Sequence, residues 1–347
     1  MRYKLFGEHT GLRVSELVLG TGNFGTGWGY GAERDDSRKI LDAYADAGGN
    51  FIDTAGVYQG GQSEEIIGDA LVGRRDDFVV ATKYTMPAGA KGGILVTGNS
   101  RKAMVVSVED SLKRLKSDYI DLLWVHMADG VTPGEEIVRG FDDLVRAGKI
   151  LYAGLSNFPA WRVARAATIA ELRGTVPIAG LQFEHSLVVR SSEQELISAG
   201  QSLGLGLVAW SPLGGGMLTG KYREQGATGR REGFGGNVFQ PENSPQRTAI
   251  LDTLLAVANE VGVTAGEVAI AWVAAKGSLP IIGPRTVEQL SANLAAAKVT
   301  LSAEQIARLD EVSAIPTAFP YNVLAGARPG YTGGKADEFD APKVTAA

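Results

Sequence analysis

The chain has 347 residues, of which 44% are hydrophobic and 21% are charged, and its formal net charge is −5. This length and composition fit one large α/β domain, or two smaller domains, with ample material for a core. The absence of a long basic run argues against a nucleic-acid partner or an anionic-membrane partner. Because the sequence has no cysteine, disulfides, thiolate metal ligands and a cysteine nucleophile are excluded, and no metal site is predicted.

The chain also lacks the patterns of a membrane or secreted protein. Met1–Gly20 has no continuous apolar segment of the kind found in signal peptides. No apolar run reaches the roughly 20 residues that a membrane-spanning helix needs. We therefore expect a soluble, cytoplasmic protein, and the lack of cysteine suits a reducing compartment.

Strand and helix patterns alternate along most of the chain. A short hairpin is expected first, from Lys4–Phe6 and Leu12–Leu17, and eight apolar strands follow with helical patterns between them. The expected strands are Leu17–Gly20, Phe51–Thr54, Phe78–Thr82, Tyr119–Val125, Ile150–Leu155, Gly180–Phe183, Gly206–Trp210 and Leu279–Ile282. Eight such units without a composition break predict an α/β fold of one (β/α)8 TIM barrel domain over residues 1–347. An open doubly wound sheet is the alternative.

Two segments do not follow this alternation. Residues 224–246 are glycine-rich and charged, and residues 317–347 are polar with scattered aromatic residues. Long irregular loops in compact folds often cover a ligand. We expect 224–246 to be a lid over the cofactor or the substrate, and 317–347 to be a C-terminal substrate loop or a tail.

A glycine-rich motif follows the first barrel strand. Gly20–Gly25 matches G-x-G-x-x-G, which in a dinucleotide-binding domain opens a helix at its third glycine. Here residues 26–31 contain three further glycines, which disfavour a helix, so we reject that interpretation. A glycine-lined loop over a ligand and a plain flexible loop remain equally compatible with the sequence.

Four ionisable residues fall where predicted strands end. Asp53, Lys83 and His126 close the second, third and fourth barrel strands, and Tyr58 lies on the loop after Asp53. The carboxyl ends of barrel strands form the active face of this fold. We therefore expect these four side chains to converge at one mouth of the barrel.

The chemistry of the four residues is mutually consistent. A buried carboxylate and a buried ammonium each need a counter-charge, so Asp53 and Lys83 are expected to pair. A tyrosine alone has a pKa near ~10, but a neighbouring ammonium stabilises the phenolate and makes the phenol a better proton donor. His126 could hydrogen-bond a substrate oxygen. Each residue alone has an ordinary structural explanation, whereas the set of four favours protonation of an alkoxide during carbonyl reduction.

These segments resemble the aldo-keto reductase family over about Leu5 to Leu309. Asn50–Tyr58 resembles its Asp…Tyr signature, Ala81–Lys83 its lysine strand, Asp118–His126 its histidine strand, and Ser111–Leu115 its helix motif. The resemblance implies a TIM barrel that binds NADPH without a Rossmann domain, with NADH the lesser alternative. It also implies that Tyr58 is the acid/base, that Lys83 and Asp53 tune it, and that His126 orients the carbonyl.

The same resemblance implies cofactor contacts at the other strand ends. Ser156, Asn157 and Gln182 would hold the nicotinamide carboxamide, and Trp210 would stack on the nicotinamide ring. Glycines after Trp210 would admit the pyrophosphate, and the fork of Arg285 suits the 2′-phosphate of NADPH. The full set of expected cofactor contacts is Thr21, Gly22, Asp53, Ser156, Asn157, Gln182, Trp210, Ser211, Leu213, Gly215, Lys221, Gly283, Arg285, Gln289 and Asn293.

The substrate pocket is predicted less directly. Trp28, Tyr30 and Tyr84 are expected to form walls for an apolar carbonyl substrate, together with the C-terminal tail. Asn23 and His185 depart from the usual family pattern, so family substrates are not carried over. Two alternatives share the fold: a non-catalytic, cofactor-sensing interaction subunit, and a Schiff-base lyase that uses Lys83 as its nucleophile.

Overall fold

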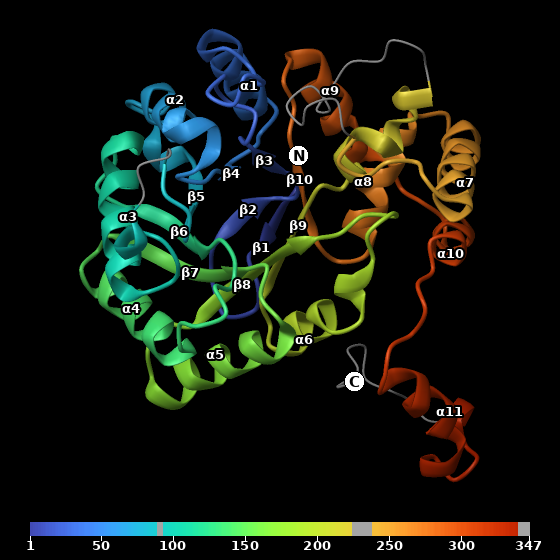
Figure 1. Ribbon diagram of the computed structural model, residues 1–347. Helices are drawn as coiled ribbons and strands as arrows, with labels where there is room; N and C mark the ends of the chain where they lie inside the picture. Colours follow the sequence, from blue (N-terminus) through green and yellow to red (C-terminus); the bar gives the residue numbers. More distant parts are fainter. Residues whose placement is uncertain (89–92, 224–237, 339–347) are drawn as a thin grey trace.

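Eight parallel strands close into a barrel with helices around its outside (Figure 1). The computed structural model describes residues 1–88, 93–223 and 238–338. The strand order is β10-β3-β4-β5-β6-β7-β8-β9, and β10 pairs in parallel with both β3 and β9. This closure confirms the predicted (β/α)8 barrel and excludes the open sheet.

The strands and helices follow the expected order, and their bounds are as follows. The strands are β1 Tyr3–Leu5, β2 Arg13–Ser15, β3 Val18–Gly20, β4 Phe51–Asp53, β5 Val79–Tyr84, β6 Ile120–Val125, β7 Ile150–Ser156, β8 Ile178–Glu184, β9 Gly206–Trp210 and β10 Leu279–Ile282. The helices are α1 Arg34–Asp46, α2 Gln62–Ala70, α3 Arg101–Leu115, α4 Gly134–Arg146, α5 Ala160–Arg173, α6 Leu196–Ser202, α7 Pro245–Val261, α8 Ala265–Ala275, α9 Val287–Ala295, α10 Ala303–Val312 and α11 Tyr321–Tyr331.

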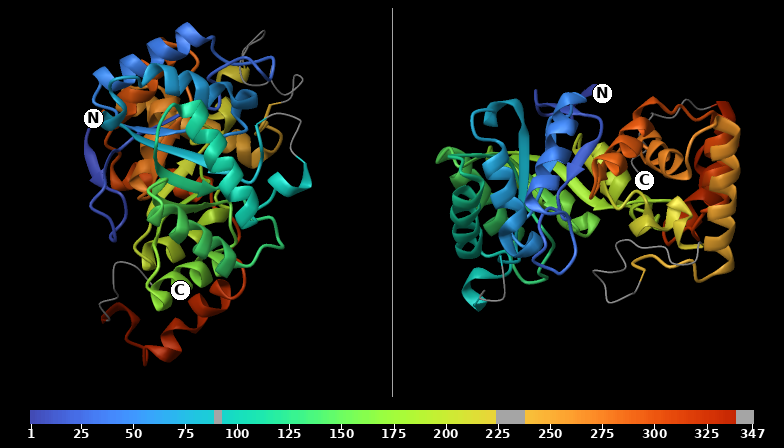
Figure 2. Two further views of the ribbon diagram at one scale, coloured as in Figure 1. Left: turned by 90° about the vertical axis from the view of Figure 1, so that its left-hand side faces the viewer. Right: turned by 90° about the horizontal axis from the view of Figure 1, so that it is seen from above.

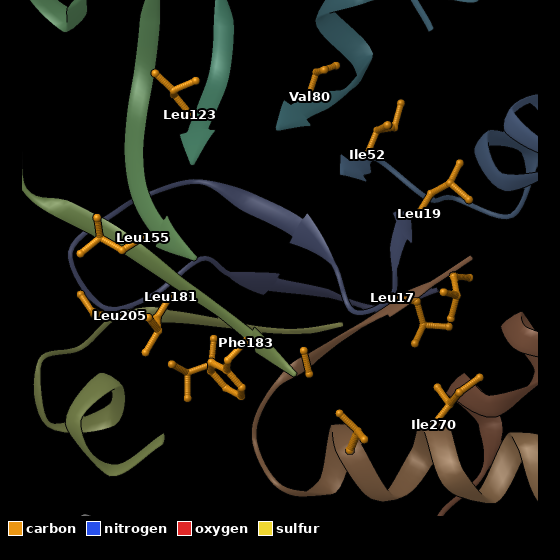
Figure 3. Packing of buried hydrophobic residues seen from close by; sticks show 14 of the residues in the cluster. Leu17, Leu19, Ile52, Val80, Leu123, Leu155, Leu181, Phe183, Leu205 and Ile270 are labelled. Atoms are coloured by element: carbon orange, nitrogen blue, oxygen red, sulfur yellow. The ribbon is translucent and has the colours of Figure 1, made fainter. Parts of the chain in front are cut away.

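Each barrel strand buries both of its faces. Ile52, Val80 and Leu123 belong to the cluster between the strands and the surrounding helices (Figure 3). Their neighbours Ala81 and Trp124 belong to a second cluster inside the barrel. Because side chains alternate along a strand, a residue two positions after an inward-facing one also faces inward, which decides the orientation of the residues at the strand ends.

The N-terminal hairpin of β1 and β2 confirms the predicted pairing and lies across one end of the barrel (Figure 1). Phe6, which follows β1, enters the barrel and meets Phe51 and Trp124 edge-on, with ring centroids 5.6 and 6.3 Å apart. Gly180 and Gly206 leave room for it, since a Cβ on either would lie 2.5–2.6 Å from the Phe6 ring. Phe6 thus fills the amino-terminal end of the barrel, and the site must be sought at the carboxyl end.

The two irregular segments are only partly described. Of the predicted lid 224–246, residues 224–237 lie outside the described residues, and α7 already begins at Pro245. The segment 317–347 is not wholly a loop, because residues 321–331 form α11, which stands beyond α10 (Figures 1 and 2). Residues 339–347 lie outside the described residues.

Among the described residues, no single helix is long and apolar enough to cross a membrane. The bent pair α7 and α8 passes that length and composition test only when its two helices are taken together, and they meet at 96°.

Candidate active site

Lys83 is the centre of the predicted group of four residues. It lies on β5 two residues after the inward-facing Ala81, so its side chain points into the barrel and is almost wholly buried. Its Nζ donates hydrogen bonds to the carboxylate of Asp53, to the backbone oxygen of Thr54 at 2.8 Å and to Tyr58 Oη at 3.2 Å. The structure therefore brings Asp53, Tyr58 and Lys83 together, as the strand ends predict.

The environment keeps Lys83 charged. Burial acts to lower its pKa, but the charge of Asp53 and the phenol of Tyr58 outweigh burial, and the pKa lies above the ordinary lysine value. Schiff-base formation needs a neutral amine at the nucleophile, which this pair disfavours. The arrangement suits a fixed positive charge beside the phenol much better than it suits a lysine nucleophile.

His126 completes the group from the end of β6. Its ring meets the Tyr58 ring edge-on, with centroids 6.0 Å apart. Its Nδ1 is buried and has no hydrogen-bond partner among the described residues. Burial, and then the charge of Lys83, lower the pKa of His126 to about 3. The imidazole is therefore neutral near pH 7, with one N–H that can donate and one nitrogen that can accept.

A chain of amides lies beside these residues. Gln182 on β8 donates from Nε2 to Asp53 Oδ1 at 2.8 Å, so it fixes the second carboxylate oxygen. Asn157 donates to the backbone oxygen of His126 at 2.9 Å and to Ser156 Oγ at 3.0 Å. Trp210 Nε1 donates to Asn157 Oδ1 at 3.1 Å. The backbone N–H of Asn157 donates to the backbone oxygen of Gln182 at 2.9 Å, so the predicted nicotinamide contacts are in one hydrogen-bonded network with the ion pair.

The turn after β9 has an unusual backbone. Ser211 has φ 55°, Gly214 and Gly215 have φ 55° and 66°, and Gly216 has φ 94°. A Cβ on Gly215 would lie 2.9 Å from Phe239, and one on Gly216 would lie 3.2 Å from Lys221. Leu213 is partly buried at the start of this turn. Glycine adopts a positive φ readily, so the strained residue here is Ser211, and strained backbone in a tightly packed turn is frequent where a protein binds a ligand.

The end of β10 carries a second positive group. The guanidinium of Arg285 lies 4.4 Å from the centroid of the Tyr30 ring. Its backbone N–H donates to Gln289 Oε1 at 2.9 Å, and Gly283 accepts a hydrogen bond from Asn23 at 2.9 Å. In the part of the chain that the structure describes, Arg285 forms no ion pair with a carboxylate. Asn293 follows Gln289 by one turn of α9.

The residues after β3 lie against the tyrosine. A Cβ on Gly22 would lie 3.8 Å from the Tyr58 ring, so the loop runs beside the phenol and leaves room next to it. Thr21 Oγ1 donates to the backbone oxygen of Asp53 at 3.1 Å. Thr21 is buried, and its hydroxyl supports the strand ends around Asp53.

The three predicted pocket residues are placed differently. Trp28 is 51% exposed and meets the Tyr58 ring edge-on at 6.1 Å, while Tyr30 lies under Arg285. Tyr84 follows the inward-facing Lys83 on β5, so it points outward into the helix-facing cluster, where its hydroxyl donates to Asn99 O at 3.4 Å. The structure therefore does not place Tyr84 in the pocket wall. Sequence reasoning also missed Gln59, whose side chain is buried beside this group.

Comparison with known proteins agrees with this geometry. The sequence model of the Aldo/keto reductase family matches residues 16–314. A norsolorinic acid reductase of Aspergillus flavus is 36% identical over 333 residues, which cover 93% of this chain and 84% of that protein. An aryl-alcohol dehydrogenase [NADP(+)] of Phanerodontia chrysosporium is 37% identical, covering 92% of this chain and 88% of the relative.

A bacterial relative is equally similar. The uncharacterized oxidoreductase YrpG of Bacillus subtilis is 37% identical over 323 residues, which cover 90% of this chain and 96% of that protein. The match spans the whole barrel and includes the strand ends that carry the four ionisable residues. The chain therefore belongs to the aldo/keto reductase family, as the sequence motifs predict.

Proposed function

We propose that the protein reduces an aldehyde or ketone to an alcohol, reversibly, with NADPH as its cofactor and Tyr58 as the proton donor. The observation that carries this proposal is the distance of 3.2 Å between Lys83 Nζ and Tyr58 Oη, with Lys83 held by the buried carboxylate of Asp53. A charge fixed at this distance stabilises the phenolate that remains after Tyr58 gives up its proton.

The residues present suit a phosphorylated dinucleotide. Lys221 and Arg285 supply positive charge, and the turn from Ser211 to Gly216 brings the backbone close to its neighbours. Ser156 and Asn157 would hold the carboxamide, and Arg285 would hold the 2′-phosphate. The aryl-alcohol dehydrogenase relative carries NADP(+) in its printed name, which supports the same choice. When bound, the dinucleotide supplies the hydride.

Three side chains of the protein supply the proton, the fixed charge and the orientation of the carbonyl. Tyr58 donates its hydroxyl proton to the carbonyl oxygen as that oxygen becomes an alkoxide. Lys83 stays protonated throughout, because Asp53 holds its charge, and it never has to be a nucleophile. The neutral imidazole of His126 donates its single N–H to the same oxygen and orients the carbonyl.

The surroundings of Tyr58 favour a substrate with a flat apolar group. The indole of Trp28 is half-exposed beside the phenol, and aromatic rings stack or meet edge-on with such a surface. One relative points the same way, since the Phanerodontia protein is named for an aryl alcohol. We infer that aromatic aldehydes are the first substrates to test.

The decisive experiment removes one oxygen atom. Tyr58→Phe should reduce turnover of an aromatic aldehyde by a factor of about 10³ or more, because the proton donor is lost. The dissociation constant for NADPH, measured by calorimetry, should stay within about threefold. Tyr119→Phe is the matched control, since Tyr119 donates to Asp76 at 2.8 Å on the outer surface. Substantial turnover by Tyr58→Phe would refute the mechanism.

A further inference from the structure

The side chain of Gln59 holds the loop of residues 22–31, which we call the glycine loop. Gln59 Nε2 donates to Gly22 O at 2.9 Å and to Tyr30 O at 3.0 Å. Its Oε1 accepts a hydrogen bond from the backbone N–H of Trp28 at 2.9 Å. One amide that is 1% exposed thus ties the start, the middle and the end of the loop together.

A second glutamine supports the same loop from the start of α2. Gln62 Oε1 accepts from the backbone N–H of Thr26 at 2.9 Å and of Gly27 at 3.1 Å. A Cβ on Gly25 would lie 2.6 Å from this oxygen, and one on Gly27 would clash with the backbone oxygen of Gln59. The glycines therefore allow the glycine loop to pack closely on the segment that follows Tyr58. Such packing argues against the alternative of a plain flexible loop.

The backbone conformation of Gln59 is unfavourable for a glutamine. Gln59 has φ 52° and ψ 32°, a left-handed conformation that glycine adopts far more readily than glutamine does. Glycines do follow it at positions 60 and 61. A glutamine at this position carries a backbone cost that its three hydrogen bonds to the loop can offset.

The loop that Gln59 holds carries two aromatic residues that lie near the site. Trp28 meets Tyr58 edge-on at 6.1 Å, and Tyr30 lies 4.4 Å from the guanidinium of Arg285. Gly22, at the start of the loop, lies beside the same phenol, because a Cβ on Gly22 would lie 3.8 Å from the Tyr58 ring. Because Gln59 binds the backbone at all three of these residues, it fixes where the indole lies relative to the phenol.

We propose that Gln59 is a positioning residue that holds Trp28 beside Tyr58, and that it thereby makes the site select flat aromatic carbonyl compounds over small aliphatic ones. This proposal rests on the proposed carbonyl reduction and names the substrate class for it. Gln59 need not touch the substrate, because it acts through the backbone of the glycine loop. A small aldehyde that does not reach the indole gains nothing from that placement.

Two substitutions test the proposal without straining the backbone. Gln59→Gly removes the amide and suits the left-handed conformation, and Gln59→Asn keeps an amide that is one methylene too short to reach the loop. For each variant, kcat and KM are measured with NADPH and either 2-naphthaldehyde or propanal. Amide hydrogen exchange of residues 22–31 is followed by mass spectrometry, and thermal unfolding checks the fold.

We expect both variants to raise KM for 2-naphthaldehyde about tenfold, because the displaced indole no longer packs on the naphthyl ring, while KM for propanal stays within about twofold. Exchange in residues 22–31 should become at least about tenfold faster. The control is Gln201→Ala, an exposed glutamine on α6. The proposal is overturned if exchange in the loop is unchanged, or if KM changes by the same factor for both aldehydes.

The exchange measurement separates this proposal from the proposed function. A wild-type protein that oxidises NADPH with neither aldehyde would contradict the proposed function and, with it, the selection of substrates. Loop exchange that still accelerates in Gln59→Gly would then show that the amide holds the loop but does not serve this reaction.

Discussion

Lys83 Nζ lies 3.2 Å from Tyr58 Oη, and the carboxylate of Asp53 holds the ammonium of Lys83 in that place. Asp53 ends β4 and Lys83 stands near the end of the neighbouring β5, so parallel pairing of the two strands sets their separation. Gln182 reaches across from β8 to hold the other carboxylate oxygen at 2.8 Å. The charge beside the phenol is thus positioned by the barrel itself rather than by a loop.

The first prediction concerns the buried ion pair. Asp53→Asn leaves the ammonium of Lys83, whose side chain is 1% exposed, without its counter-ion. Breaking such a pair should lower the free energy of unfolding by about 3–5 kcal/mol, as measured by urea denaturation. The double variant Asp53→Asn with Lys83→Met should recover most of that loss, because no charge is then buried. A double variant that is less stable than Asp53→Asn would contradict this account.

The second prediction follows from the pKa of His126, which burial and Lys83 lower to about 3 from an ordinary 6.5. Between these values the unfolded chain binds a proton that the folded protein does not, so the fold loses stability as pH falls from 6.5 towards 3. His126→Asn should weaken this pH dependence by up to about 1 kcal/mol per pH unit. Urea denaturation at pH 7, 5.5 and 4.5 measures it, with the exposed His9→Asn as control. Equal slopes for wild type and His126→Asn would refute the neutral buried imidazole.

Much of this site follows from the sequence, for a clear physical reason. A closed parallel barrel brings all strand carboxyl ends to one mouth, so Asp53, Lys83 and His126 must meet once eight strands are recognised. The alternation of side chains along a strand also argues against Tyr84 as a wall of the substrate pocket, because the residue after an inward-facing lysine must face the helices. The structure also confirms that the glycine motif of residues 20–25 is not the start of a Rossmann domain, since no helix begins at Gly25.

Other features have no local pattern that could predict them. Gln59 bonds to a loop about 30 residues earlier in the chain, and a single glutamine beside a tyrosine gives no sign of such contacts. The helix α11 contains Gly326, Pro329 and Gly330, which all disfavour helix, so composition pointed to a loop. Most of the expected lid, residues 224–237, lies outside the described residues and stays a prediction.

The third prediction concerns Glu193, which links the loop after β8 to α10. Burial acts to raise its pKa, but hydrogen bonds from His185 and Arg190 outweigh burial and lower the pKa to about 2. Arg190 also donates to the backbone oxygen of Asp310 in α10 at 2.7 Å. The lowered pKa stabilises the fold above the ordinary glutamate value of 4.5, and this stability is lost as pH falls from 4.5 towards 2.

Glu193→Gln should therefore lower the free energy of unfolding by about 2 kcal/mol at pH 7, and by much less at pH 2.5. Thermal or urea unfolding of both proteins at several pH values between 2.5 and 7 gives the comparison. Glu304→Gln is a suitable control, because Glu304 is an exposed glutamate on α10. Parallel stability curves for wild type and Glu193→Gln would show that the hydrogen bonds to His185 and Arg190 carry no such energy.

The last prediction separates the two possible dinucleotides. The guanidinium of Arg285 lies against the Tyr30 ring and forms no ion pair with a described carboxylate, so its charge-assisted hydrogen bonds are free for a phosphate. Arg285→Ala should weaken NADPH binding about tenfold to a hundredfold and leave NADH binding within about twofold, as measured by calorimetry. Arg285→Lys should fall between, since it keeps the charge but loses the planar fork. Arg308→Ala, which removes an exposed pair with Glu260, should change neither dissociation constant. Equal weakening of NADPH and NADH binding by Arg285→Ala would contradict a contact with the 2′-phosphate. The guanidinium would then bind a group that both dinucleotides contain, and the preference for NADPH would have to arise elsewhere.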